Sequence, residues 1–262
     1  MTIADLKIGA RLYFGNYGVG EALHPVSWLK ASKDCEFISE FVLDVLKFDA
    51  REPGNPDRNI YWYGNGHYEL SNIIQFMNSY EDDWYAPMHD FDSPPGNPNT
   101  GVDAYGEYLS RPGFLRFFED YELDCLASRI DLPTGANIFG AGGSPKFQLF
   151  NRKGFRGRPH PDLVHHKIGH DMNEWSFCEF WLSDYTGDHS AVYVDRAGYH
   201  RGSLPYLSSG LRPKCTIGMG TLVEPMQDGS GFRIVPFESV KSKNRNTKVC
   251  TDEEFMQLMG LL

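Results

Sequence analysis

The densest group of potential metal ligands is a histidine-rich segment, residues 159–171, with the sequence PHPDLVHHKIGHD. His166 and His170 are four residues apart, so a helix would place both imidazoles on one face. Asp162 or Asp171 could then supply a third ligand. The segment lacks the His-Glu-x-x-His pattern of zinc hydrolases, and the proline and glycine within it oppose a helix. We therefore expect a solvent-exposed polar loop here rather than a metal site.

A second candidate is calcium binding by the acidic loop that contains Asp90 and Asp92. Asp82 and Asp83 precede this loop, and carboxylate oxygens are ligands that Ca²⁺ prefers. The loop does not have the Asp-x-Asp-x-Asp-Gly spacing of a known calcium loop, and acidic loops without that spacing are usually only solvated. Calcium stays an alternative, and we expect the protein to need no cofactor.

Recognisable signatures of catalysis do not occur in the sequence. There is no Gly-x-Ser-x-Gly motif, and the Ser, His and Asp residues lie on unrelated loops, so a catalytic triad cannot be assembled from the pattern. Glycines 140, 142 and 143 lack the strand-then-helix frame of a phosphate loop. Two cysteines in the last third, Cys178 and Cys215, could in principle cooperate in an oxidation, but Cys178 alternates with apolar residues and is expected in the core. We predict a protein that is not an enzyme, with a metal-dependent hydrolase or an oxidase as the alternative.

Residues suited to contact a ligand are concentrated between positions 184 and 209. Tyr supplies a large contact area at little cost in side-chain entropy, and Arg is frequent at interface hot spots. This composition predicts a binding surface, although some of the tyrosines should only cover the edge of a sheet. The predicted ligand-binding residues are Tyr185, Asp188, His189, Tyr193, Tyr199, His200, Arg201 and Tyr206, together with Ser208 and Ser209.

Two apolar segments, residues 177–182 and 191–195, must hold this surface in place. In both segments, apolar residues occur at alternate positions, which predicts two half-buried strands. The alternating residues are Cys178, Phe180 and Leu182 in the first segment, and Val192 and Val194 in the second.

Further short strands and two helices are predicted in the first half of the chain. Residues 6–48 contain three apolar segments separated by turns, which we interpret as strands. Ser71 or Asn72 should begin a helix, and a second helix should begin near Ser110 with Pro112 in its first turn. The first helix has an apolar face formed by Ile73, Phe76, Met77 and Tyr80.

In the second half, strands are predicted at residues 146–150 and 215–223, and the Asp228-Gly229 pair indicates a hairpin. A capping box at Thr251 and Glu254 should open an amphipathic helix that docks a partner or packs on its own domain. Its apolar face consists of Phe255, Leu258, Met259 and Leu262. Altogether the pattern predicts an α+β fold with mostly antiparallel short strands, two short helices and long loops.

Composition limits the classes of function. The chain has 262 residues, 41% of them hydrophobic, which is enough for a sizeable core. A formal net charge of −10 disfavours nucleic acid and anionic membrane surfaces as partners. Five widely spaced cysteines include no Cys-x-x-Cys pair. We also expect no signal peptide and no membrane insertion, because neither a cleavable leader nor a run of 18 apolar residues occurs.

Several segments resemble an uncharacterised domain family common in tailed phages and prophages of Gram-positive, often gut-dwelling, bacteria. The most recognisable is residues 48–79, where an acidic-Pro-Asn loop leads to a Tyr-Gly-Asn turn and a Ser-Asn-Ile helix. The chain has Ser183 where the family carries an Arg that would form a salt bridge. Further matches are residues 8–15, Val26-Ser27-Trp28, Trp84-Tyr85, His89, Asp92, Pro94-Pro95, residues 112–115, Trp181-Leu182, residues 192–198 and Leu211-Arg212-Pro213.

The resemblance implies a C-type-lectin-like fold for residues 1–225. The hairpin, linker and amphipathic helix predicted from local pattern make up a C-terminal part, residues 226–262, most of which lies outside the resemblance. This fold is similar to that of the phage variable binding proteins diversified by retroelements, and more distantly to the formylglycine-generating enzymes. Those relatives place their ligand contacts on loops in the last third. The Glu52-Pro53-Gly54-Asn55 loop also resembles the Glu-Pro-Asn sugar-binding signature of C-type lectins, but it lies in the other half of the domain and carries an inserted Gly.

On this basis we expect a phage-encoded virion protein that binds a host surface glycan or protein, or another virion subunit, through its C-terminal loops. Localisation in the virion follows from the same resemblance. A head or tail decoration subunit without an external ligand is the main alternative. Association into a homo-oligomer stays open.

Overall fold

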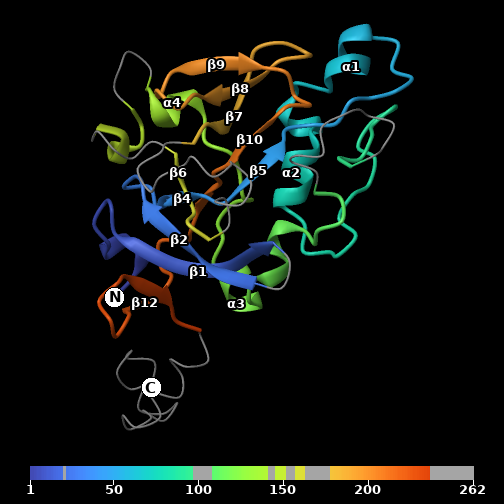
Figure 1. The fold of residues 1–262 in the computed structure, drawn as a ribbon. Helices are drawn as coiled ribbons and strands as arrows, with labels where there is room; N and C mark the ends of the chain where they lie inside the picture. The colour runs from blue at the N-terminus through green and yellow to red at the C-terminus, as the bar shows by residue number, and fades with distance from the viewer. Residues whose placement is uncertain (20–21, 97–107, 141–144, 152–156, 163–177, 237–262) are drawn as a thin grey trace, which may run out of the picture.

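The computed structural model describes residues 1–19, 22–96, 108–140, 145–151, 157–162 and 178–236 (Figure 1). Within these residues the protein is a mixed α+β structure in which strands dominate and helices are short, so the predicted fold class is confirmed at that level. Two sets of predictions lie outside the described residues. They are the histidine pair His166 and His170 with Asp171, and the C-terminal helix with Phe255, Leu258, Met259 and Leu262.

The first sheet joins the two ends of the described chain. Its strands, in spatial order, are β11 (Lys214–Thr216), β3 (Glu36–Ser39), β2 (Ala22–Lys30), β1 (Arg11–Val19), β13 (Phe232–Ile234) and β12 (Val223–Pro225). β1 and β2 form the largest hairpin, in which Phe14 stacks on Trp28 with ring centroids 4.9 Å apart. β13 pairs with β1 in parallel, Leu12 opposite Phe232, so main-chain hydrogen bonds attach the β12–β13 hairpin to the N-terminal hairpin.

The second sheet carries the predicted binding loops. Its strands, in spatial order, are β5 (Asp44–Lys47), β10 (Ser208–Leu211), β7 (Phe180–Tyr185), β8 (Ala191–Val194) and β9 (His200–Ser203). β7 and β8 pair antiparallel with Trp181 opposite Tyr193, which confirms the two strands predicted from alternation. A short parallel pair, β4 (Phe41–Val42) and β6 (Arg158–Pro159), forms a separate two-stranded sheet, and β4 lies between β3 of the first sheet and β5 of the second in the chain.

The start of β7 is buried on both faces, so the prediction of a half-buried strand was wrong there. Phe180, Trp181 and Leu182 are each at most 1% exposed. Trp181 packs edge-on against Phe48 with ring centroids 5.5 Å apart, and its indole N–H donates to the Leu46 carbonyl at 2.8 Å. The chain that follows β5 therefore covers the face that alternation assigns to solvent.

The first predicted helix is present as α2 (Asn72–Met77), and most of its predicted apolar face is buried. Tyr80 is the exception, at 62% exposure, because the helix ends before it. The second predicted helix is wrong as one continuous element. Its residues form the 3-10 helix η4 (Phe114–Phe117) and the one-turn α3 (Asp120–Leu123), separated by the extended residues Phe118 and Glu119. The helix starts late because Gly113 is extended, with ψ 153°, and its amide donates to the Glu81 carbonyl at 2.8 Å instead of to a helical neighbour.

Two further sequence predictions change in the structure. Residues 146–150 were predicted as a strand, but their end forms the 3-10 helix η5 (Gln148–Asn151). The amides of residues 146, 147 and 148 donate to the carbonyls of residues 136, 137 and 31, and not to a neighbouring strand. The strand predicted at 215–223 is divided between β11 and β12. The hairpin predicted around Asp228-Gly229 is confirmed by the antiparallel pairing of β12 with β13.

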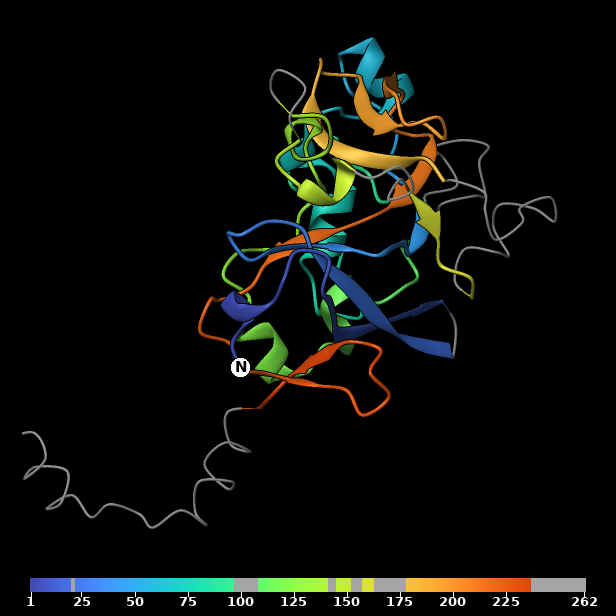
Figure 2. The ribbon, with the colours of Figure 1, turned by 90° about the vertical axis from the view of Figure 1, so that its left-hand side faces the viewer.

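Both sheets contribute to one apolar core, which contains Leu12 of β1 and Leu182 of β7. The remaining short helices are η1 (Ile3–Asp5), α1 (Arg58–Tyr63), η2 (Tyr68–Leu70) and α4 (Gly135–Ile138). Figure 1 shows α1 and α2 toward one end of the second sheet and α4 toward the other, and Figure 2 shows the two sheets one above the other. Among the described helices, none has the length and apolar character needed to cross a membrane.

Candidate functional site

The predicted binding turn between β7 and β8 lies against a segment from the first half of the chain, residues 64–67. The Gly66 amide donates to the Asp188 carbonyl at 2.7 Å. A Cβ on Gly66 would lie 2.5 Å from the Gly187 carbonyl oxygen and 2.6 Å from the Ser190 nitrogen. Only glycine therefore allows the two backbones to approach this closely, and the approach brings the next residue, His67, onto the turn.

His67, Tyr185 and Asp188 form one compact exposed group. The His67 ring stacks on Tyr185 with ring centroids 4.2 Å apart, and His67 Nε2 lies 2.9 Å from Asp188 Oδ1. The Tyr185 hydroxyl donates to the same carboxylate oxygen. Hydrogen bonds from Tyr185 and His67 hold the pKa of the Asp188 carboxyl below its ordinary value. The group therefore presents an aromatic surface, with Tyr185 50% exposed, beside a fixed negative charge.

A second aromatic group lies at the other end of the same segment. The Tyr206 amide donates to the Tyr63 carbonyl at 3.1 Å, and the two rings stack with centroids 6.2 Å apart. The Arg51 guanidinium carbon lies 4.1 Å from the centroid of the Tyr206 ring, a cation–π contact. Together the two groups make up what we call the aromatic face, which consists of Arg51, Tyr63, His67, Tyr185, Asp188 and Tyr206.

The other predicted binding residues divide between the two sides of the second sheet. Tyr193 and Arg201 are cross-strand partners in register with Trp181, so all three project from one side. Arg201 also pairs with Asp195 at 3.2 Å. His200 is opposite Val194 and projects from the other side, where its ring lies 6.0 Å from that of Phe139 near α4. His200 and Arg201 therefore lie on opposite sides of the sheet, because neighbouring residues of a strand face opposite ways, and the structure does not bring them together.

Of the four predicted residues that remain, His189 and Tyr199 are on the outside of the molecule, whereas on β10 Ser208 is half-buried and Ser209 is buried. His189 is exposed in the turn beside Asp188, and Tyr199 is 62% exposed with the Arg201 guanidinium 5.6 Å from its ring centroid. Both are accessible to a partner.

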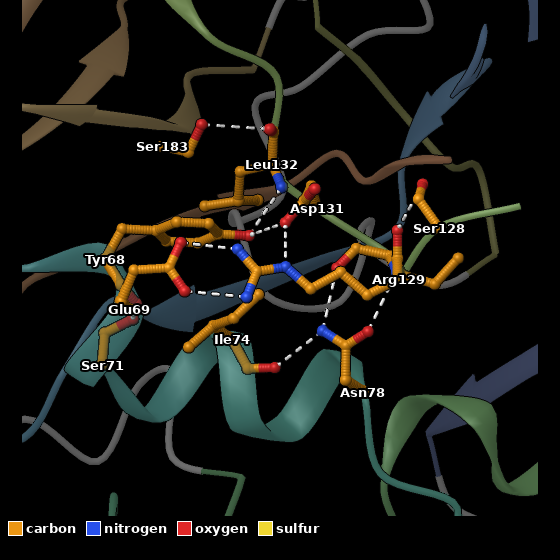
Figure 3. A network of polar contacts seen from close by, with 11 residues as sticks. Tyr68, Glu69, Ser71, Ile74, Asn78, Ser128, Arg129, Asp131, Leu132 and Ser183 are labelled. Atoms are coloured by element: carbon orange, nitrogen blue, oxygen red, sulfur yellow. Dashed lines mark hydrogen bonds and ion pairs between the residues drawn. The ribbon is translucent and has the colours of Figure 1, made fainter. Parts of the chain in front are cut away.

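A polar network holds the segment after His67 in place (Figure 3). The buried Tyr68 hydroxyl accepts from the Leu132 amide at 2.9 Å, and Arg129 makes two hydrogen bonds to Glu69, of 2.5 and 2.7 Å. Ser183 of β7 donates to the Leu132 carbonyl at 3.2 Å. Ser183 thus connects β7 to this network by a hydrogen bond.

Asp49, which accepts from the Asn65 amide next to Gly66, belongs to an acid cluster with Glu52, Tyr85, His89 and Asp92, of which Asp49 and Glu52 are fully buried and the others half-buried. Burial raises the pKa of the Asp49, Glu52 and Asp92 carboxyls above their ordinary values, most of all for Asp49. Asp92 accepts from the Met88 amide at 2.9 Å, whereas Asp90 is exposed. The two predicted calcium ligands therefore have different environments, and in the described part of the chain no three His, Cys, Asp or Glu side chains are arranged to hold a metal ion.

The two cysteines considered for oxidation lie in different places. Cys178 precedes β7 in the second sheet and Cys215 lies on β11 in the first, and both are free and buried. Burial raises the pKa of the Cys178 thiol to about 12 and that of Cys215 still further above its ordinary value. Each thiol is therefore protonated at neutral pH.

Sequence reasoning missed Arg51, Tyr63 and His67, which complete the aromatic face. A signal was available, because Tyr61, Trp62, Tyr63 and Tyr68 surround a Gly-Asn-Gly turn, and Trp62 is 53% exposed. Searches of protein-family models, curated proteins and solved structures find no match. The assignment of function therefore depends on the geometry of the site itself.

Proposed function

We propose that this chain is a virion-associated binding protein of a phage or prophage, and that it contacts a glycan or protein of the host surface through the aromatic face. The observation that carries the proposal is the exposed His67–Tyr185 stack with the ionised Asp188 beside it. An aromatic ring offers an apolar contact surface, and a carboxylate accepts hydrogen bonds from hydroxyl or amide donors of a ligand.

Preorganisation supports the same proposal. The aromatic side chains of the face are held by ring stacking and by main-chain bonds to neighbouring segments, so little side-chain entropy is lost on binding. The phage context and the C-type-lectin-like fold come from the resemblance of the sequence, with which the mostly antiparallel strands and short helices are compatible.

The proposal is tested by binding of the labelled chain to a glycan array and to intact Gram-positive cells. We expect Tyr185→Ala and Tyr206→Ala each to weaken binding about tenfold or more, as for aromatic residues at the centre of an interface. Tyr80→Ala is the matched control, since Tyr80 is exposed but lies outside the aromatic face. Equal binding by all four proteins would exclude the aromatic face. A chain that assembles into particles and binds neither glycans nor cells would instead support the decoration role.

A further inference from the structure

Arg51 is a half-buried cation without a hydrogen-bond partner in the part of the chain that the structure describes. Its Nε is shielded from solvent and unbonded, and neither of its Nη groups bonds to a described residue. Buried polar groups are rarely left unpaired. The other described arginines that are buried or half-buried all donate to an oxygen atom. They are Arg11, which donates to Glu40, Arg111, which donates to Asp44, and Arg212, which donates to the Ser39 carbonyl.

The two carboxyl groups nearest to Arg51 in the chain form their hydrogen bonds with other residues. Asp49 accepts from two main-chain amides, at 2.7 and 3.0 Å. Glu52 accepts from Asn55 Nδ2 at 2.6 Å, and its other carboxylate oxygen lies 3.6 Å from His89 Nε2. The positive charge of Arg51 is therefore not paired with a carboxylate of the described chain.

The ring of Tyr206 holds the Arg51 guanidinium in position. The guanidinium carbon lies over the ring, 4.1 Å from its centroid. Tyr206 is fixed in turn, because its amide donates to the Tyr63 carbonyl and the two rings stack. A guanidinium carries its N–H groups in a planar fork, which matches the two oxygens of a carboxylate or a phosphate. A fork that is already held loses little side-chain entropy when it binds an anion.

Arg201 provides a contrast on the second sheet. Its guanidinium carbon also lies over a tyrosine ring, 5.6 Å from the centroid of Tyr199, but its Nε donates to Asp195 Oδ2 at 3.2 Å. The charge of Arg201 is therefore neutralised within the chain, and that of Arg51 is not. Arg201 is thus a matched control for the role of Arg51.

We propose that Arg51 is an anion-binding residue of the aromatic face, and that the ligand carries a carboxylate or a phosphate that accepts hydrogen bonds from its two Nη groups. Tyr206 is a positioning residue, which keeps the guanidinium in place. The net charge of −10 disfavours a long polyanion as the partner, whereas one planar fork suits a single oxyanion. The ligand class is therefore a saccharide with an isolated acidic group. That the oxyanion belongs to a saccharide rests on the proposed function, whereas the anion site itself does not.

An NMR titration of the isotope-labelled full chain tests the anion site directly. The probes are glucose 6-phosphate, glucuronate and glucose, and the amide signals of Arg51 and Tyr206 are followed. We expect a saturable shift with at least one acidic sugar, and binding about tenfold or more weaker for glucose. The comparison of the two acidic sugars distinguishes a phosphate from a carboxylate.

Arg51→Met removes the charge and the N–H donors but keeps a long unbranched side chain over the Tyr206 ring. We expect it to lose about tenfold or more in affinity for the acidic sugar. Arg201→Met should bind as the parent chain does, because its guanidinium is already paired with Asp195.

An array of acidic saccharides and their neutral counterparts tests the ligand class. We expect the parent chain to bind the acidic members about tenfold more tightly. Arg51→Met should lose this preference, and Arg201→Met should retain it.

The inference is overturned if neither acidic sugar gives a saturable shift, or if Arg51→Met binds the acidic sugar as the parent does. It is also overturned if Arg201→Met loses as much affinity as Arg51→Met, since a general loss of positive charge would then explain both results. If the urea midpoint shows that Arg51→Met does not fold, the comparison of the acidic sugars with glucose on the parent chain still decides.

The proposed function fails separately from this inference. It fails if the Tyr185 and Tyr206 variants bind cells and the array as the parent does, even though an acidic sugar shifts the Arg51 signal. Conversely, if those variants lose binding while acidic and neutral saccharides bind equally, the aromatic face stands and the anion site is wrong.

Discussion

At the scale of single residues, the site contains positions where no free space is left for an added group. Gly66 is the clearest example, because its neighbours on both sides are backbone atoms of the β7–β8 turn. Side chains can change rotamer to relieve a clash, but backbone atoms that belong to a sheet turn cannot move without breaking hydrogen bonds. The contact between His67 and Tyr185 therefore depends on a residue that itself makes no side-chain contact.

We predict that Gly66→Ala destabilises the protein by about 1–3 kcal/mol, the usual cost of overpacking a tight site. The added methyl group would lie 2.5 Å from the Gly187 carbonyl oxygen, so the turn has to shift away. Urea denaturation measures the loss as a lower midpoint. Gly220→Ala is the control, since no atom lies within 4 Å of the point that its Cβ would occupy and no loss is expected. An unchanged midpoint for Gly66→Ala would contradict the close approach of the two segments.

At the scale of elements, the hydrogen bonds drawn in Figure 3 connect η2 to the segment beside β7, and they differ in how far solvent reaches them. Arg129 and Glu69 make the shortest bonds, yet their side chains are 45% and 64% exposed. Solvent competes for exposed ion pairs, so short distances there do not imply a large contribution to stability. The bond from the Leu132 amide to the Tyr68 hydroxyl is longer, at 2.9 Å, but it satisfies a buried donor.

Tyr68→Phe is therefore expected to lower the free energy of unfolding more than Glu69→Gln does. Loss of the hydroxyl leaves the buried Leu132 amide unpaired, at a cost of about 1–3 kcal/mol, whereas loss of the exposed ion pair costs less than about 1 kcal/mol. Chemical denaturation of both variants beside the parent chain gives the comparison. If Glu69→Gln were the more damaging, the surface pair and not the buried hydroxyl would hold η2 in place.

At the scale of the whole molecule, stability should depend on pH through carboxyl groups with opposite pKa shifts, among them those near the aromatic face. Asp49, Glu52 and Asp92 have raised pKa values because they are buried. Asp188 and Glu69 have lowered pKa values, because Tyr185 and Arg129 respectively donate hydrogen bonds to them. The first set is stabilising when protonated and the second when ionised, so the two sets favour opposite ends of the acidic range.

We predict that the free energy of unfolding decreases as pH rises from about 5 toward neutrality. The folded state holds protons on the buried carboxyls there, whereas the unfolded state has already released them, so raising the pH favours the unfolded state. Below about pH 4 the contribution of Asp188 and Glu69 is lost as well, which places the maximum in mildly acidic solution. Urea denaturation across this range provides the measurement, and Glu52→Gln should flatten the decline. Stability that rises steadily up to pH 8 would show that the buried carboxyls do not control it.

The predictions that succeeded concern local pattern. Alternation predicted strands that overlap β7 and β8, the Asp-Gly pair marked the β12–β13 hairpin, and Ser71 preceded α2, because each depends on residues close together in the chain. Two predictions from local pattern were wrong where a distant segment packs on the residues concerned. The second helix is interrupted after Gly113, which packs on Ser79, and Trp181 lies in a strand that is covered on both faces.

What only the tertiary structure decided is which residues share a site. His67 meets Asp188 across a separation of 121 residues, and His200 is directed away from its neighbour Arg201 by the pleat of β9. The sequence by itself determined an α+β chain with a tyrosine-rich region near β7–β9. The complete aromatic face and the burial of the nearby carboxyls depend on contacts between segments that are distant in the chain. A local sequence pattern cannot predict such contacts, because burial is decided only when the whole fold is assembled.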